Sequence, residues 1–358
     1  MDPAALIPIP DAIPVSWWWF QAFLLLTFFL HLVAMNAMLG TAFIGLVSHL
    51  RGTNDRASCT EAISSNLPFT IAFAVNFGVA PLLFVQVLYG HLIYTSSILM
   101  AVFWLAVVGL LIIAYGLAYV YKDLYPRLGD ARLAVIGLAT LLLLAIAFIF
   151  TNNISLMQKP IAWDRYFDQP RGLLLALDDP MLLPRYLHFM VSSVAVGGLA
   201  IALFFHWRQR GGDRNAGAWV ASGCRWFSYA TMANFAVGFW FLATLPKGML
   251  TTTIPGLLLL ATLVGGIALS VPAIGLGLAG RALPALWCTL GTIGLMVLAR
   301  SLLRTVLLAP WFSPAQLPVN PSSAPLLFFL LVLLAGVTLI GWMVRFTLRS
   351  CANQEDRP

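Results

Sequence analysis

Long apolar stretches separated by short polar breaks dominate the chain. Nine of these stretches reach the length of about 20 residues that a transmembrane helix needs. They are residues 17–49, 67–92, 95–121, 133–151, 183–207, 222–246, 254–280, 283–308 and 323–348. The pattern predicts an all-α polytopic membrane protein with about nine transmembrane helices.

One polar break is much longer than the rest. Residues 152–182 are predicted to form a loop outside the membrane, whose end, RGLLLALDDP, could form a short surface helix. The flanking segments are an outer N-terminal segment, 1–16, and a cytoplasmic tail, 349–358. The remaining residues, 17–348, read as a single transmembrane domain without a soluble domain.

Composition and charge support a membrane class and give an orientation. The chain is 61% hydrophobic and 9% charged, with a mean hydropathy of +0.91, far from soluble proteins. Of the 20 Lys and Arg residues, thirteen lie on the side that faces the cytoplasm if the N-terminus is outside, which the positive-inside rule favours. The net charge of +7 is therefore a topology signal, and we expect no nucleic-acid partner.

The apolar stretches hold histidines but no acids in their interiors. All 13 Asp and Glu residues fall outside the stretches or at their ends. His31 lies midway along the first stretch, and His91 and His188 lie at the outer face, whereas His49 and His206 lie at cytoplasmic ends. Intramembrane imidazoles without carboxylates favour a metal centre over an acid-based proton or cation path.

Haem iron is the metal that histidine most often binds in apolar helix bundles. We therefore take His31, His91 and His188 as candidate ligands, while each could instead hydrogen-bond a neighbouring helix. For His49 and His206, next to basic loops, the interfacial role is preferred. No C-x-x-C-H motif is present, so c-type haem attachment is not expected. Possible sulfur ligands are Met35, Met38, Met190, Met249 and Met296.

Three arginines near the outer face point to anionic groups. Arg185 lies about one turn before His188, where it could pair with a haem propionate. Arg300 and Arg304 are one turn apart and share a helix face. They could bind propionates as well, or extend to the outer surface as long cationic side chains do.

Four segments resemble subunit I of cytochrome bd quinol oxidase, and the resemblance covers nearly the whole chain. WFQAFLLLTFFLHLVAMNAML is similar to the first helix of that family and would place a haem-ligating histidine at His31. NNISLMQKP followed by LLPRYLHFMVSSVAVGG would place the ligand of the low-spin haem at His188. The other two segments are NFGVAPLLFVQVLYG and GLMVLARSLLRTVLLAPWFSPAQLPV.

Departures from the family pattern change the function that the resemblance implies. Two haem-ligating glutamates of the family correspond to Gln86 and Arg300, and the GRQPW motif and the long quinol-binding loop are missing. The methionine ligand has Met249 as its nearest candidate. His91 is an added imidazole, and we expect it to share one iron with His31, which would saturate a low-spin b haem.

These residues predict a membrane b-type cytochrome subunit with two b haems in a bacterial cytoplasmic membrane. It would transfer electrons between the quinone pool and an extracytoplasmic partner such as a c-type cytochrome, with a second membrane subunit possible. Candidate quinone contacts are Lys247, Gln158 and Asn153. The alternatives are a divergent oxygen-reducing oxidase subunit and a haem-poor membrane anchor or scaffold.

Overall fold

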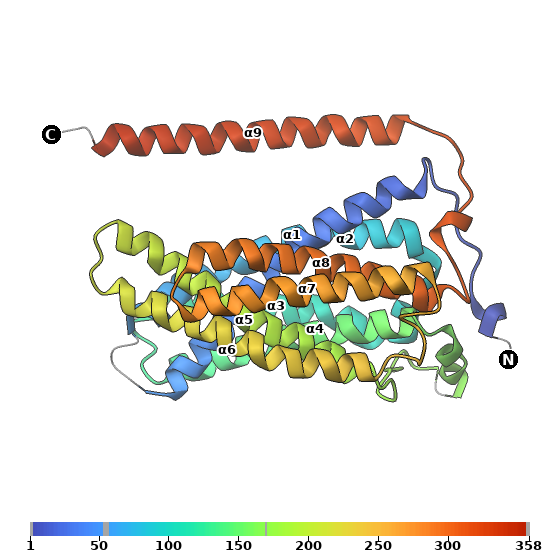
Figure 1. Cartoon of the computed structure of the whole chain (residues 1–358), viewed down its shortest axis with the longest axis horizontal. Coiled ribbons are helices and arrows are strands. Elements are labelled where there is room, and N and C mark those ends of the chain that lie inside the picture. The colour runs from blue at the N-terminus through green and yellow to red at the C-terminus, as the bar shows by residue number, and fades with distance from the viewer. Residues whose placement is uncertain (1–2, 53–56, 169, 356–358) are drawn as a thin grey trace.

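The computed structural model describes residues 3–52, 57–168 and 170–355, and long helices dominate them (Figure 1). The long helices are α1 (Trp17–Leu50), α2 (Ala57–Leu99), α3 (Ala101–Asp123), α4 (Ala131–Met157), α5 (Leu182–Arg210), α6 (Ala216–Ala243), α7 (Ile254–Leu278), α8 (Ala282–Leu308) and α9 (Ala324–Glu355). Short 3₁₀ helices are η1 (Pro3–Leu6), η3 (Pro160–Asp168) and η4 (Pro314–Gln316).

The chain is an all-α polytopic membrane protein. Among the described residues, 8 helices are long and apolar enough to cross a bilayer. α6 is also long enough to cross a bilayer, but its polar and aromatic residues make it less hydropathic than the other eight. It packs between α5 and α7. All nine predicted stretches therefore form helices. Eight of these helices are apolar enough to span a membrane.

Several predicted boundaries need correction. The outer loop was expected over 152–182, yet α4 continues to Met157, so that the connection begins at Gln158. The segment RGLLLALDDP forms turns rather than a surface helix. The predicted tail 349–358 is helical as far as Glu355, and 356–358 lie outside the described residues.

Adjacent glycines on α5 hold the bundle together. A Cβ on Gly197 would lie 2.6 Å from the Cα of Gly40 on α1, and a Cβ on Gly198 would lie 2.7 Å from the backbone nitrogen of Phe227 on α6. Small residues let membrane helices approach until their backbones touch. α5 therefore contacts α1 on one side and α6 on the other.

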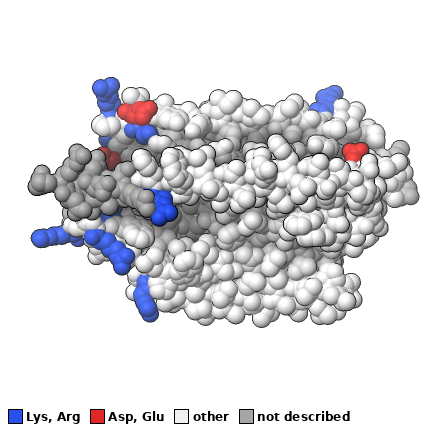
Figure 2. Space-filling model, turned by 90° about the horizontal axis from the view of Figure 1, so that it is seen from above, with Lys and Arg blue, Asp and Glu red and all other residues white. Residues whose placement is uncertain are grey.

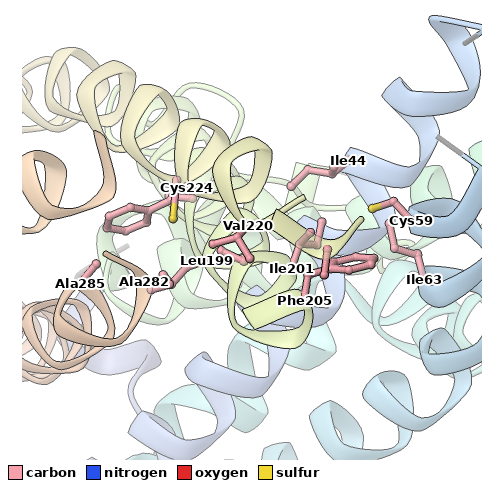
Figure 3. Close-up of a cluster of buried hydrophobic side chains, with 14 of the residues drawn as sticks. Ile44, Cys59, Ile63, Leu199, Ile201, Phe205, Val220, Cys224, Ala282 and Ala285 are labelled. Carbon is pink, nitrogen blue, oxygen red and sulfur yellow. The ribbon is translucent and has the colours of Figure 1, made fainter. Parts of the chain in front are cut away.

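A cluster of buried apolar side chains fills one end of this bundle. Figure 3 shows Phe205 of α5 among side chains from α1, α2 and α6, including Ile44, Ile63 and Val220. Ala282 and Ala285 of α8 pack against these side chains and complete the cluster. Figure 2 shows Lys and Arg side chains gathered at one end of the molecule, as the positive-inside rule predicts for a cytoplasmic end.

α9 stands apart from the other helices (Figure 1). In its most apolar window, 0% of the residues are buried, whereas α5 buries 44%. Its contact with the bundle is aromatic: the Phe329 ring lies 5.1 Å from that of Phe23 and 6.1 Å from that of Phe84. α9 is thus positioned near its first turns and exposed along the rest of its length.

Candidate haem pocket

A cavity of about 620 Å³ runs through the middle of the bundle. Its volume falls in the range typical of cofactor and ligand sites. Residues of all eight helices from α1 to α8 line it, most of them apolar. Along α8 the lining extends from Thr289 to Leu303, which is about 20 Å of helix rise. The cavity is therefore long enough to cross much of a bilayer.

His31 of α1 lines this cavity with one ring nitrogen already fixed. Its Nδ1 lies 2.9 Å from the carbonyl oxygen of Ala74 on α2, which holds the ring in the tautomer with the proton on Nδ1. Nε2 then keeps a free lone pair. Gly78 allows this approach, because a Cβ there would lie 2.9 Å from Cε1 of His31. A metal-binding histidine usually has this arrangement, with its second nitrogen donating to a carbonyl.

His188 of α5 lines the same cavity. Its Nδ1 is buried and has no hydrogen-bond partner among the described residues. Gly238 of α6 lies opposite, where a Cβ would be 3.5 Å from Cε1 of the imidazole. Because a buried polar atom without a partner is costly, this nitrogen is available to a bound group.

Three arginines at one end of the bundle lack sufficient counter-charge. Arg185 donates from Nη1 to Ser155 Oγ at 3.1 Å, but Nη2 has no partner among the described residues. Its charge is partly offset by Asp179. Arg300 lies over the Phe28 ring at 4.2 Å, and the positive charges of Arg304 and Arg185 both act on it. Such a cluster favours an anionic ligand.

Arg304 has a different position from the other two. It is 3% exposed, so it does not reach the outer surface as the alternative required. Its guanidinium lies 4.5 Å from the centre of the Tyr89 ring. Arg185 and Arg300 line the cavity, while Arg304 lies behind them and adds positive charge.

The predicted pairing of His31 with His91 on one iron does not fit the structure. Gly78 of α2 contacts the His31 ring. From Gly78 the helix rises about 16 Å to a kink at Tyr89, and His91 lies beyond that kink. His91 does not line the cavity; its ring packs against Phe312 at 4.4 Å. We therefore correct the prediction: His91 is not positioned to share an iron with His31.

The proposed sulfur ligand also lies elsewhere. Met249 packs with Leu259 and Leu303 and does not line the cavity. The other four candidate methionines all line it: Met35, Met38, Met190 and Met296. Four of the five candidate methionines therefore lie at the cavity, and Met249, the match taken from the resemblance, does not.

The three candidate quinone contacts separate in the structure. Lys247 is exposed in the connection between α6 and α7. Asn153 lines the cavity, but its amide is already bonded to Ser96 and Ser97 at 3.1 and 3.0 Å. Gln158 lines the cavity and its buried Oε1 has no partner among the described residues. Gln158 is thus the one of the three with a free acceptor at the cavity.

Two asparagines at the cavity were missed by the sequence analysis. Asn36 is 4% exposed, and its Oδ1 has no partner in the described part of the chain. The Oδ1 of Asn234 is likewise unpaired, while its Nδ2 donates to Ser192 Oγ at 2.7 Å. A carboxamide inside an apolar stretch was visible in the sequence and could have identified both residues.

His49 and His206 do not line the cavity. Nε2 of His49 lies 2.7 Å from the Tyr121 hydroxyl, an interhelical hydrogen bond. Within residues 3–52, 57–168 and 170–355, no three His, Cys, Asp or Glu side chains converge as a bare metal ion would need. A haem needs only one or two axial side chains, so His31 and His188 suit a haem better than a bare ion.

Comparison with known proteins adds no relative. No protein-family model matches the chain, and no curated protein sequence matches it.

Proposed function

We propose that this protein is a membrane b-type cytochrome subunit. It would transfer electrons between the quinone pool of a bacterial cytoplasmic membrane and an extracytoplasmic partner such as a c-type cytochrome. One observation carries the proposal: His31 and His188 line one apolar cavity together with Arg185 and Arg300. Each imidazole has a ring nitrogen without a partner among the described residues.

The residues present fit b haems. His31 and His188 would supply axial nitrogens, and Arg185 and Arg300 would pair with the propionates. The lining is mostly apolar, and the missing Cβ of Gly78 lets the His31 ring pack against α2. A bound haem would supply reversible one-electron transfer. The resemblance to subunit I of cytochrome bd oxidase supports the same assignment.

The test is a spectrum of the purified protein, reduced with dithionite minus oxidised, repeated under carbon monoxide. Sharp b-type bands that carbon monoxide leaves unchanged are the expected result, because four methionines line the cavity and could supply the sixth ligands. If the full-length protein, purified with its membrane partners, shows no haem band, the proposal is wrong and the anchor or scaffold alternative takes its place.

One observation favours a second candidate function, a divergent oxygen-reducing oxidase subunit. Because His91 does not line the cavity, it does not supply the second imidazole that would saturate an iron at His31. An iron with an open position binds carbon monoxide. A band that shifts under carbon monoxide would therefore place the oxidase first.

Arg300→Gln should lower the midpoint potential of the haem at His31. The positive charge of Arg300 acts on His31, and a nearby cation stabilises the reduced, less positive form. Losing about 1 kcal/mol of this interaction corresponds to a shift of about 40 mV for one electron. A redox titration followed at the b-type band measures the shift.

The control for this titration is Arg210→Gln. Arg210 lies at the other end of the molecule, exposed at the end of α5. Its replacement should leave both potentials unchanged. An unchanged potential in Arg300→Gln would mean that Arg300 does not lie beside a haem.

A further inference from the structure

Beside His31, residues that line the cavity are also exposed. Two residues of α2, Ala74 and Gly78, bracket the imidazole. Each is followed by a valine that lines the cavity and is also exposed, Val75 at 39% and Val79 at 51%. The wall between the imidazole and the outside of the bundle is therefore about one residue thick here.

The opposite rim of this thin wall is also apolar. Val107 and Leu111 of α3 line the cavity, and so does Phe150 of α4, which is 37% exposed. Val75 and Val79 lie near the middle of α2, at a depth where a transmembrane helix faces hydrocarbon. A charged headgroup is strongly disfavoured at that depth, so the opening suits a neutral lipid-soluble molecule.

We propose that an isoprenoid quinone or quinol reaches the cavity from the bilayer through an opening between α2 and α3. This lateral opening is formed by Val75, Val79, Val107 and Leu111. The choice of a quinone as the ligand rests on the proposed function. The position of the opening rests only on which residues line the cavity and are also exposed. The opening lies beside His31, far from Lys247 and the outer loop.

Asn36 provides a polar contact for the headgroup inside the cavity. It lies five residues after His31 on α1, and its buried Oδ1 is unpaired among the described residues. A carboxamide oxygen accepts a hydrogen bond from a quinol hydroxyl, and the Asn36 amide nitrogen can donate to a quinone carbonyl. The neutral headgroup of a quinone matches a neutral carboxamide, whereas a phospholipid headgroup would bring a charge.

Val79→Trp tests the opening, because a bulky indole would fill it. The matched control is Leu83→Trp, one turn along α2, where Leu83 is equally exposed at 54% but does not line the cavity. Each variant is purified as the full chain, mixed with decylubiquinone, and sampled by rapid filtration over time. We expect uptake of the quinone to slow ~tenfold in Val79→Trp and to remain unchanged in Leu83→Trp.

Equal uptake rates in the two variants would overturn the proposal. If Val79→Trp is not monodisperse by size exclusion, Val75→Phe fills the same opening with a smaller change and replaces it. The haem content of the same samples, read from their reduced-minus-oxidised spectra, separates this inference from the proposed function. Slowed quinone uptake in a protein without haem would support the opening and reject the cytochrome. Haem together with unchanged uptake would support the cytochrome and reject the opening.

Discussion

His188→Ala should remove one b-type haem signal while the other remains. His188 lines the cavity, and its unpaired Nδ1 lies in a buried site beside Gly238. Without the imidazole, the haem there would lose its protein ligand, so its affinity should fall by orders of magnitude. The measurement is the haem-to-protein ratio of the purified variant together with its reduced-minus-oxidised spectrum. We expect the ratio to fall by about half if two haems bind.

His206→Ala is the matched control, because His206 lies on the same helix, does not line the cavity and was predicted to be interfacial. Its spectrum should equal that of the parent protein. If His188→Ala retains the parent spectrum, His188 is not a ligand, and an axial role for His31 alone would have to explain any haem.

Gly40→Val should disrupt the packing of α1 against α5. A Cβ on Gly40 would overlap the carbonyl oxygen of Ser193, and the contacted atoms belong to a backbone that no rotamer change can move. The helices must then separate, which should cost at least the ~3 kcal/mol at the upper end of ordinary overpacking. The measurement is the yield of monodisperse protein and its apparent melting temperature in detergent.

Gly116→Val on α3 is the control for this substitution, since no heavy atom lies within 4 Å of a Cβ built there. Both variants place the same branched residue in a helix, so the difference between them reports the lost α1–α5 contact. If the two variants melt at the same temperature, the close approach at Gly40 does not determine the stability of the bundle.

The helices could be predicted from the sequence because a bilayer imposes one simple rule. Backbone groups in hydrocarbon must bond within the helix, so long apolar stretches become helices whatever their neighbours are. The ends were less predictable. α4 runs past 151 to Met157, because Asn152 and Ser155 find polar partners in the outer connection and in α5 rather than ending the helix.

The candidate site was predictable in its residue types and not in its pairings. Polar groups in an apolar stretch are costly, and on this ground the sequence singled out His31, His188 and Arg300, which all line the cavity. Which of them lie together depends on helix crossing angles and depth, which a sequence pattern does not contain. His91 shows the limit: one turn beyond Gln86 in sequence, it packs at the outer cap against Phe312.

The isolation of α9 has a consequence for how the protein is made. The described residues that line the cavity all lie before α9, so the cavity can form before α9 leaves the ribosome. α9 contacts its neighbours near Phe329 and is exposed over its most apolar window. Its stability in the membrane therefore comes mainly from the transfer of its apolar side chains from water to lipid, and little from packing against other helices. Displacement or rotation of α9 should therefore leave the cavity unchanged, since no described residue of α9 lines it.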